Sequence, residues 1–223
     1  MNGYEDFIQK WLPIIGQSTI ETFQMVGIAL LFSIIIGIPL GILLVLSRPG
    51  QALDNKLLYH TLNLIINIIR SIPFIILLFF ILPFTKLIVG TSIGVKGVIV
   101  PLVLYTSPYI ARLMESALLE VEQGVVEAYT AMGIKTRQII WHVMLREARP
   151  SIILGLTIAT VSLIGATAMA GLVGAGGLGD LAYRFGHLRY EVDVMYATVL
   201  ILIIIVQLIQ SLGNRLAARI KKD

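Results

Sequence analysis

Residues 22–47 read TFQMVGIALLFSIIIGIPLGILLVLS, and this stretch contains no Asp, Glu, Lys or Arg. A helix of about 20 residues, rising about 1.5 Å per residue, crosses the hydrocarbon core of a bilayer, so this run is long enough to span it. Further apolar runs follow at 71–85, 97–111, 150–179 and 194–214. Continuous runs indicate helices rather than the alternating strands of a membrane barrel. The sequence therefore predicts an all-α polytopic membrane protein with five transmembrane helices.

The composition supports the same fold class and excludes several functions. Of the 223 residues, 57% are hydrophobic and 13% are charged, and the mean hydropathy is +0.90. These values exclude an ordinary soluble enzyme and a disordered chain. The sequence has no Cys, so thiolate metal sites and a disulfide framework are excluded as well. The net charge of +4 favours a membrane protein with basic loops, and we expect no nucleic-acid partner.

We expect one transmembrane domain over residues 1–223. The predicted spans, which leave a large loop at 114–150, are about 20–46, 62–84, 97–113, 151–177 and 194–214. The N-terminal residues carry Glu5, Asp6 and only Lys10 before the first span, so they lack the basic region of a cleaved signal peptide. We expect the first span to be retained.

The distribution of Lys and Arg predicts the orientation of the chain in the membrane. The segments on one side hold eleven of these residues, or twelve with Arg70, and those on the other side hold five. Basic loops face the cytoplasm. We therefore expect the C-terminus and the 114–150 loop to be cytoplasmic and the N-terminus to be outside.

The loop at 114–150 is the largest and is dense in charge, but its apolar residues alternate with polar ones in a helical pattern. One interpretation is an amphipathic helix on the lipid headgroups. The other is a docking helix for a cytoplasmic partner. The residue pattern leaves both open.

Within this loop, Glu127-Ala128-Tyr129 is followed after three residues by Gly133 and after nine more by Val143-Met144-Leu145. Ala148 and Pro150 lie just beyond. This pattern resembles the EAA loop of the ABC importer permeases. It departs from that loop at Tyr129, which replaces an Ala, and at Arg146, which replaces a Pro.

The resemblance extends over nearly the whole chain and narrows to the methionine-uptake permeases of that family. The segments that carry it are 47–50, 70–78, 83–85, 88–94 and 173–179.

The resemblance implies an ABC importer permease fold and a multi-pass place in the bacterial cytoplasmic membrane. It implies a homodimer whose pathway lies between the two copies, two ATP-binding subunits, an extracytoplasmic solute-binding protein, and alternating access. It also implies that the loop forms a coupling helix seated on the ATP-binding subunit. The residues expected in that coupling site are Glu127, Ala128, Met132, Gly133, Ile134 and Leu145. The sequence contains no G-x-x-x-x-G-K-[ST] motif, so we expect this chain to be no enzyme and the partner subunit to bind ATP and Mg.

The fourth span carries small residues at every fourth position, which places Ser162, Ala166, Ala170 and Gly174 on one helix face. Such a face allows close helix packing, and in a transporter it suits helices that slide or part. Met169 is a bulky, flexible side chain in this small-residue stretch. We expect Ser162, Ala166, Met169 and Ala170 to border the translocation pathway or its gate, and the alternative for Met169 is a side chain that only fills a gap in the packing. Gly37 and Gly41 form a second packing motif, in the first span.

Two alternative functions remain. The chain is a permease for another small solute, or it is a membrane-embedded hydrolase that uses Ser92 of a G-x-S-x-G pattern with His187. The second pattern has a simpler explanation as turn chemistry. The glycines at 174, 176 and 179 also match G-x-G-x-x-G, but they follow an apolar helix and not a strand, so helix termination explains them better.

Overall fold

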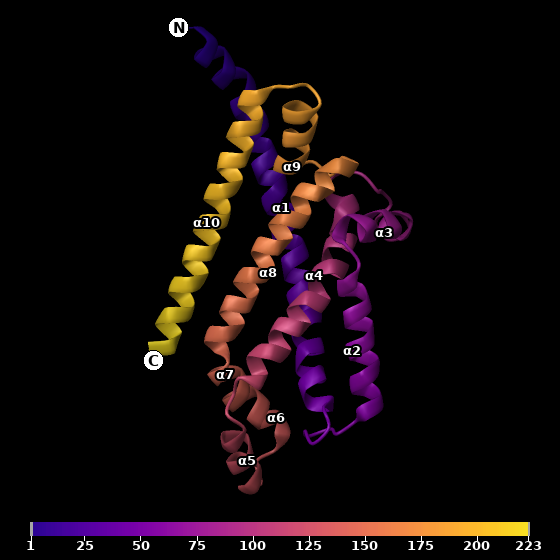
Figure 1. Ribbon diagram of the computed structural model, residues 1–223, viewed down its shortest axis with the longest axis vertical. Coiled ribbons are helices and arrows are strands. Elements are labelled where there is room, and N and C mark those ends of the chain that lie inside the picture. Colours follow the sequence, from indigo (N-terminus) through magenta and orange to yellow (C-terminus); the bar gives the residue numbers. More distant parts are fainter. Residues whose placement is uncertain (1, 223) are drawn as a thin grey trace. The chain divides into compact units, whose positions relative to one another are not determined.

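The computed structural model describes residues 2–222, and every regular element in this range is a helix (Figure 1). The long helices are α1 (Asn2–Ser47), α2 (Lys56–Ser71), α3 (Phe74–Val89), α4 (Gly94–Leu119), α8 (Arg149–Ala170) and α10 (Val192–Lys222). The short elements are α5 (Gln123–Ala131), α6 (Thr136–Ile139), η1 (Ile140–Met144), α7 (Leu145–Glu147), η2 (Gly171–Val173), α9 (Gly177–Leu181) and η3 (Ala182–His187).

Four helical stretches of the described range are long and apolar enough to cross a membrane, and the bent pair α2–α3 supplies a fifth span if it counts as one. The four are Gln9–Ser47, Gly94–Leu119, Arg149–Val173 and Val192–Lys221. The predicted all-α polytopic membrane fold is therefore confirmed.

The predicted second span, 62–84, is not one straight helix. α2 ends at Ser71 and α3 begins at Phe74, with Pro73 between them in an extended conformation (φ −55°, ψ 137°). Proline has no amide hydrogen to continue the ladder of α2, and its ring disfavours a helical conformation for the residue before it. The chain therefore stops one helix and starts another inside a single apolar run.

Other helix bounds also differ from the predicted ranges. α4 continues past residue 113 to Leu119, because Met114 and Leu118 are buried and the apolar face carries on. The segment between α4 and α8 therefore begins at 120 and not at 114. α8 ends at Ala170 and η2 at Val173, since Gly174 adopts the left-handed φ of +73° that terminates a helix.

The structure forms two compact units, and α1, α4, α8 and α10 contribute residues to both. The first unit contains residues 2–32, 72–105 and 160–209. Its core joins α1, α3, α4, α8, α9 and α10, and its fully buried side chains include Met25, Leu78, Leu102, Leu163 and Leu178. α1 begins well before the predicted residue 20, because Trp11 and Ile15 on its first turns pack against Leu181 and Val194.

The second unit contains residues 33–71, 106–159 and 210–222. α1 packs against α4 here through the predicted glycine motif. A Cβ added at Gly37 would lie 2.7 Å from the Ser107 carbonyl oxygen, and one added at Gly41 would lie 2.6 Å from that of Ala111. The backbones of α1 and α4 can approach this closely because neither residue has a side chain.

Candidate functional site

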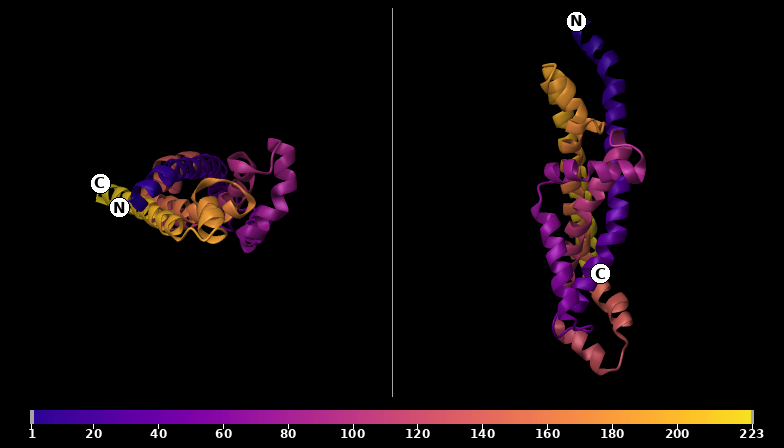
Figure 2. Two further views of the ribbon diagram at one scale, coloured as in Figure 1. Left: turned by 90° about the horizontal axis from the view of Figure 1, so that it is seen from above. Right: turned by 90° about the vertical axis from the view of Figure 1, so that its right-hand side faces the viewer.

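Residues 120–148, which we name the coupling segment, form short helices joined by turns between α4 and α8 (Figure 2). Gly133 follows α5 with φ +73°, a conformation that glycine adopts without steric penalty. Its amide donates to the Thr130 carbonyl at 3.0 Å, and the amide of Ile134 donates to the Tyr129 carbonyl at 3.2 Å. These two hydrogen bonds form a Schellman cap. Gly133 therefore sets the direction in which the chain leaves α5.

The surface of α5 is open, because none of its residues is buried. Glu127 and Ala128 are exposed, and so is Met132, which caps the helix and is 65% exposed. Ile134 and Leu145, farther along the coupling segment, are half-buried. The structure therefore places the first three predicted coupling residues on one free helix and uses the last two partly for packing.

Trp141 is a second exposed group of the coupling segment, and the sequence pattern did not single it out. It is 60% exposed and lies in η1, a π-helix anchored by the buried Ile140 and Met144. π-helical turns occur frequently at functional sites. Trp is also enriched among the residues that dominate protein interfaces. The signal in the sequence is this aromatic ring among the polar residues Arg137, Gln138 and His142.

A groove of about 640 Å³ lies between the coupling segment and the loop that follows α1. The loop contributes Gly50, Gln51 and Ala52. The coupling segment contributes residues that include Gln123, Val126, Glu127, Thr130, Ala131, Thr136, Ile139, Ile140 and Met144. Glu127 therefore borders this groove and is also exposed on α5.

The two ends of the coupling segment are joined at its base. The hydroxyl of Ser151, on the first turn of α8, donates to the carboxylate of Glu120, which follows α4. This contact closes the segment into a loop that starts and ends at the same place in the second unit.

α8 separates the predicted pathway residues onto different faces. Ala166 and Ala170 are buried in the core of the first unit. Ser162 is half-buried, and its hydroxyl lies 3.4 Å from that of Tyr105. Met169 is 49% exposed and is not part of that core. Of this set, Met169 is the side chain that the folded chain leaves most accessible.

The G-x-S-x-G pattern around Ser92 lies in the turn between α3 and α4. Gly90 and Gly94 have φ of +83° and +73°, and the hydroxyl of Thr91 accepts from the amide of Ile93 at 3.2 Å. These glycines flank Ser92 for conformational reasons. His187 stacks on Tyr183, with ring centroids 6.0 Å apart. Among the described residues, no cluster of three or more His, Asp or Glu side chains could hold a metal ion.

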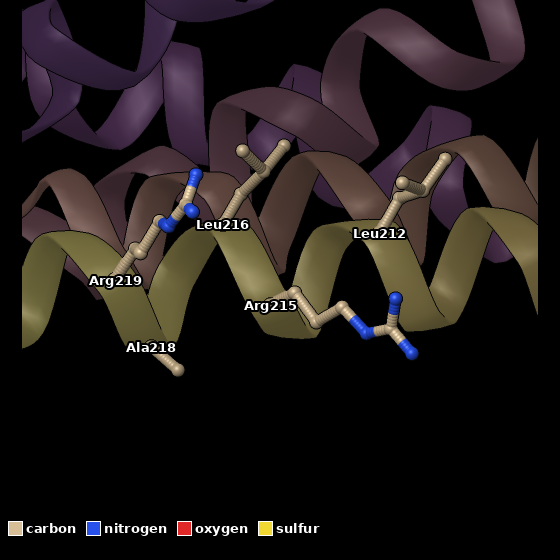
Figure 3. A pocket seen from close by; sticks show the side chains of 5 residues that line it. All are labelled: Leu212, Arg215, Leu216, Ala218 and Arg219. Carbon is tan, nitrogen blue, oxygen red and sulfur yellow. The ribbon is translucent and has the colours of Figure 1, made fainter.

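Figure 3 shows a shallow pocket on α10 where two basic side chains lie beside exposed leucines. Its lining residues are Leu212, Arg215, Leu216, Ala218 and Arg219. All come from one helix. Apolar and guanidinium groups together suit the end of a spanning helix, where hydrocarbon meets headgroups.

Bundled apolar helices with an exposed, folded segment between two of them define a multi-pass α-helical membrane protein. The family model of the binding-protein-dependent transport system inner membrane component matches residues 34–222. The chain belongs to this family and is a multi-pass component of the inner membrane.

Individual relatives and a solved structure support the same family assignment. The chain is 47% identical over 206 residues to the probable D-methionine transport system permease protein MetI of Pasteurella multocida, covering 92% of this chain and 95% of the relative. It is 47% identical over 161 residues to the D-methionine transport system permease protein MetI of Escherichia coli K12, covering 72% and 73%. A solved structure of the inward-facing MetNI methionine ABC transporter contains a chain that matches with a TM-score of 0.92 and 44% identity, covering 94% of this chain and 97% of that one.

Proposed function

We propose that this chain is the permease subunit of an ATP-driven importer and that its substrate is methionine. The observation that carries this proposal is the 47% identity to a D-methionine transport permease over 92% of the chain. Two copies of the chain form the pathway, two ATP-binding subunits dock on the coupling segments, and a solute-binding protein delivers methionine from outside. The excess of basic residues puts the coupling segment and C-terminus in the cytoplasm and the N-terminus outside.

Transport then proceeds by alternating access. Closure of the ATP-bound subunits moves the coupling segments, and the spanning helices shift between inward-open and outward-open states. The exposed Glu127 and Ala128 on α5 and Met132 at its C-cap meet the partner, and the cap at Gly133 holds α5 at the angle that docking requires. This chain performs no chemical step.

The substrate assignment is tested by uptake of labelled methionine into proteoliposomes that hold the complete complex. We expect ATP-dependent accumulation that unlabelled methionine competes away, and unlabelled D- and L-methionine in separate arms reveal the stereochemical preference. Accumulation of a different small solute, with none of methionine, would leave the family intact and refute the substrate. Hydrolysis by the isolated chain that Ser92→Ala abolishes would support the hydrolase instead.

The coupling assignment is tested at Gly133. Valine there meets a positive φ that a β-branched residue strongly disfavours, so Gly133→Val should distort the exit from α5. The matched control is Gly124→Val, in α5 itself, where an added Cβ also meets nothing within 4 Å but φ is not positive. We expect the first variant to insert but to lose most of its ATP-driven uptake. Equal uptake by both variants would contradict the docking role.

The pathway assignment rests on Met169, which borders the route of the solute. A zwitterionic amino acid loses hydration that only polar groups replace, and this part of α8 offers hydroxyls such as Ser162 but no charge. The site is therefore weak and transient, and the binding protein sets most of the selectivity. Met169→Ala should change the transport rate more than the preference among substrates, and unchanged kinetics would refute the assignment.

A further inference from the structure

A buried carboxylate in the second unit joins three helices near the coupling segment. Glu115 of α4 is 2% exposed, and its Oε1 lies 3.4 Å from Nε of Arg48, the residue after α1. Its Oε2 accepts from Nη1 of Arg112, one turn earlier on α4. Nη2 of Arg112 donates to Oδ1 of Asn63 at 2.6 Å and to Oδ1 of Asn67 at 2.9 Å, both on α2.

The contact between Arg48 and Glu115 compensates the burial of Oε1. This oxygen accepts no hydrogen bond from the described residues, so the ionic contact is the interaction that the structure gives it. A buried charge without a partner is strongly unfavourable. Arg48 is held in turn by Tyr59 of α2, with its guanidinium carbon 5.7 Å from the ring centroid. The end of α1 is therefore tied to both α2 and α4.

Arg48 and Glu115 each lie a few residues before a segment that lines the groove beside the coupling segment. The amide of Gln51 donates to the Arg48 carbonyl at 3.0 Å, and residues 50–52 line one side of the groove. Glu115 lies one turn before the end of α4, and only 120–122 separate that end from α5, which lines the other side. The salt bridge between Arg48 and Glu115 therefore connects the two chain segments that continue into the two sides of the groove.

We propose that Glu115 and Arg48 are positioning residues of the transport cycle. Their contact makes the ends of α1, α2 and α4 follow the coupling segment as one body when the ATP-binding subunit moves it. Without the contact, α4 and α2, which Arg112 still joins through Asn63 and Asn67, move with the segment while the end of α1 lags, so ATP is hydrolysed without the matching movement of the spans. This inference rests on the proposed function and adds to it the residues that carry the motion.

The test measures methionine accumulated per ATP hydrolysed by the complete complex in proteoliposomes. Arg48→Gln keeps the Glu115–Arg112 pair and removes the contacts of the end of α1 with Glu115 and Tyr59, and Glu115→Gln removes the charge that both arginines contact. We expect ATP hydrolysis to continue in both while the ratio falls about threefold or more. Arg48→Lys retains a positive charge and should retain most of the ratio. Lys56→Gln removes an exposed charge of the same sign nearby and should match the wild type.

The outcomes separate this inference from the proposed function. A wild-type complex that accumulates no methionine contradicts the proposed function. A wild-type complex that works, beside Arg48→Gln and Glu115→Gln variants with an unchanged ratio, contradicts the positioning role alone. Variants that lose only the amount of assembled complex, with the ratio unchanged, would show a purely structural salt bridge. If Glu115→Gln does not assemble, Arg48→Gln decides, and failure of both to assemble counts against the proposal.

Discussion

At the scale of single residues, glycines on the same helix differ in what a side chain would meet. A Cβ added at Gly41 would lie 2.5 Å from Cβ of Met114, whereas one added at Gly27 meets nothing within 4 Å. Both glycines lie in α1, so local helix propensity is the same for each. The difference comes from α4, which packs against Gly41.

We therefore expect Gly41→Ala to destabilise the protein by roughly 1–3 kcal/mol, because backbone and a Cβ atom must move apart. Gly27→Ala should be neutral or stabilising by roughly 0.5–1 kcal/mol, because alanine favours the helix. The apparent melting temperature of the solubilised complex measures both. An equal shift in the two variants would contradict the close approach of α1 and α4.

Trp141 is the residue whose exposed ring offers the largest aromatic contact on the coupling segment. Because it is 60% exposed, Trp141→Ala should leave the folding of this chain almost unchanged. If the ring enters a pocket of the ATP-binding subunit, its loss should weaken docking by about 2 kcal/mol or more. Co-purification of that subunit with the variant measures the effect, and full retention at low subunit concentration would place Trp141 outside the interface.

At the scale of elements, α8 has one face that is buried in the core of the first unit and another that is exposed. Ala166 and Ala170 fill the core of the first unit, while Met169 and Gly165 are exposed. Burial explains the small side chains at Ala166 and Ala170, whereas Ser162 is half-buried and Gly174 is exposed where the helix has ended. The same helix therefore packs within its own chain and offers a free face outside it.

Ala170→Leu should overfill the core and cost roughly 1–3 kcal/mol, because the site is fully buried. Met169→Leu conserves volume on the exposed face of the same helix and should leave stability within about 1.5 kcal/mol of the wild type. Thermal unfolding of the complex compares them. Equal stability of both variants would mean that the buried face tolerates bulk and is not closely packed.

At the scale of the whole molecule, large apolar side chains remain exposed on every long helix, as expected of a chain surrounded by lipid and by other subunits. The proposed homodimer requires that part of this surface meets a second copy. The exposed face of α8 that carries Met169 is the part that we assign to the pathway between the copies.

The sequence has no Cys, so an introduced one is the single thiol of the chain. We expect Met169→Cys to form covalent dimers with a short bis-maleimide in the assembled complex. Ala166→Cys, on the buried face of α8, should not be cross-linked. A Met169→Cys variant that is not cross-linked in an active complex would contradict the assignment of the pathway to this face.

The sequence by itself determined that the chain is helical and crosses a membrane, because the apolar length of a segment is a local property that depends on no distant residue. It also placed the proposed coupling residues Glu127, Ala128 and Gly133 on one loop, since the pattern that carries the resemblance is short and continuous. The break at Pro73 also follows from a local property, because proline has no amide hydrogen to continue the helix.

The tertiary structure alone decided which faces of these helices are buried. In a chain so rich in apolar residues, the hydropathy of α8 does not distinguish Ala166, which packs in a core, from Met169, which does not. The tertiary structure also decided the partner of Glu115. Two helices, α2 and α3, separate Arg48 from Glu115 along the sequence. Their side chains meet because α1 and α4 pack through Gly37 and Gly41. Electrostatic pairing acts over a few ångströms, so it follows from the packing of distant segments and cannot be derived from either segment alone.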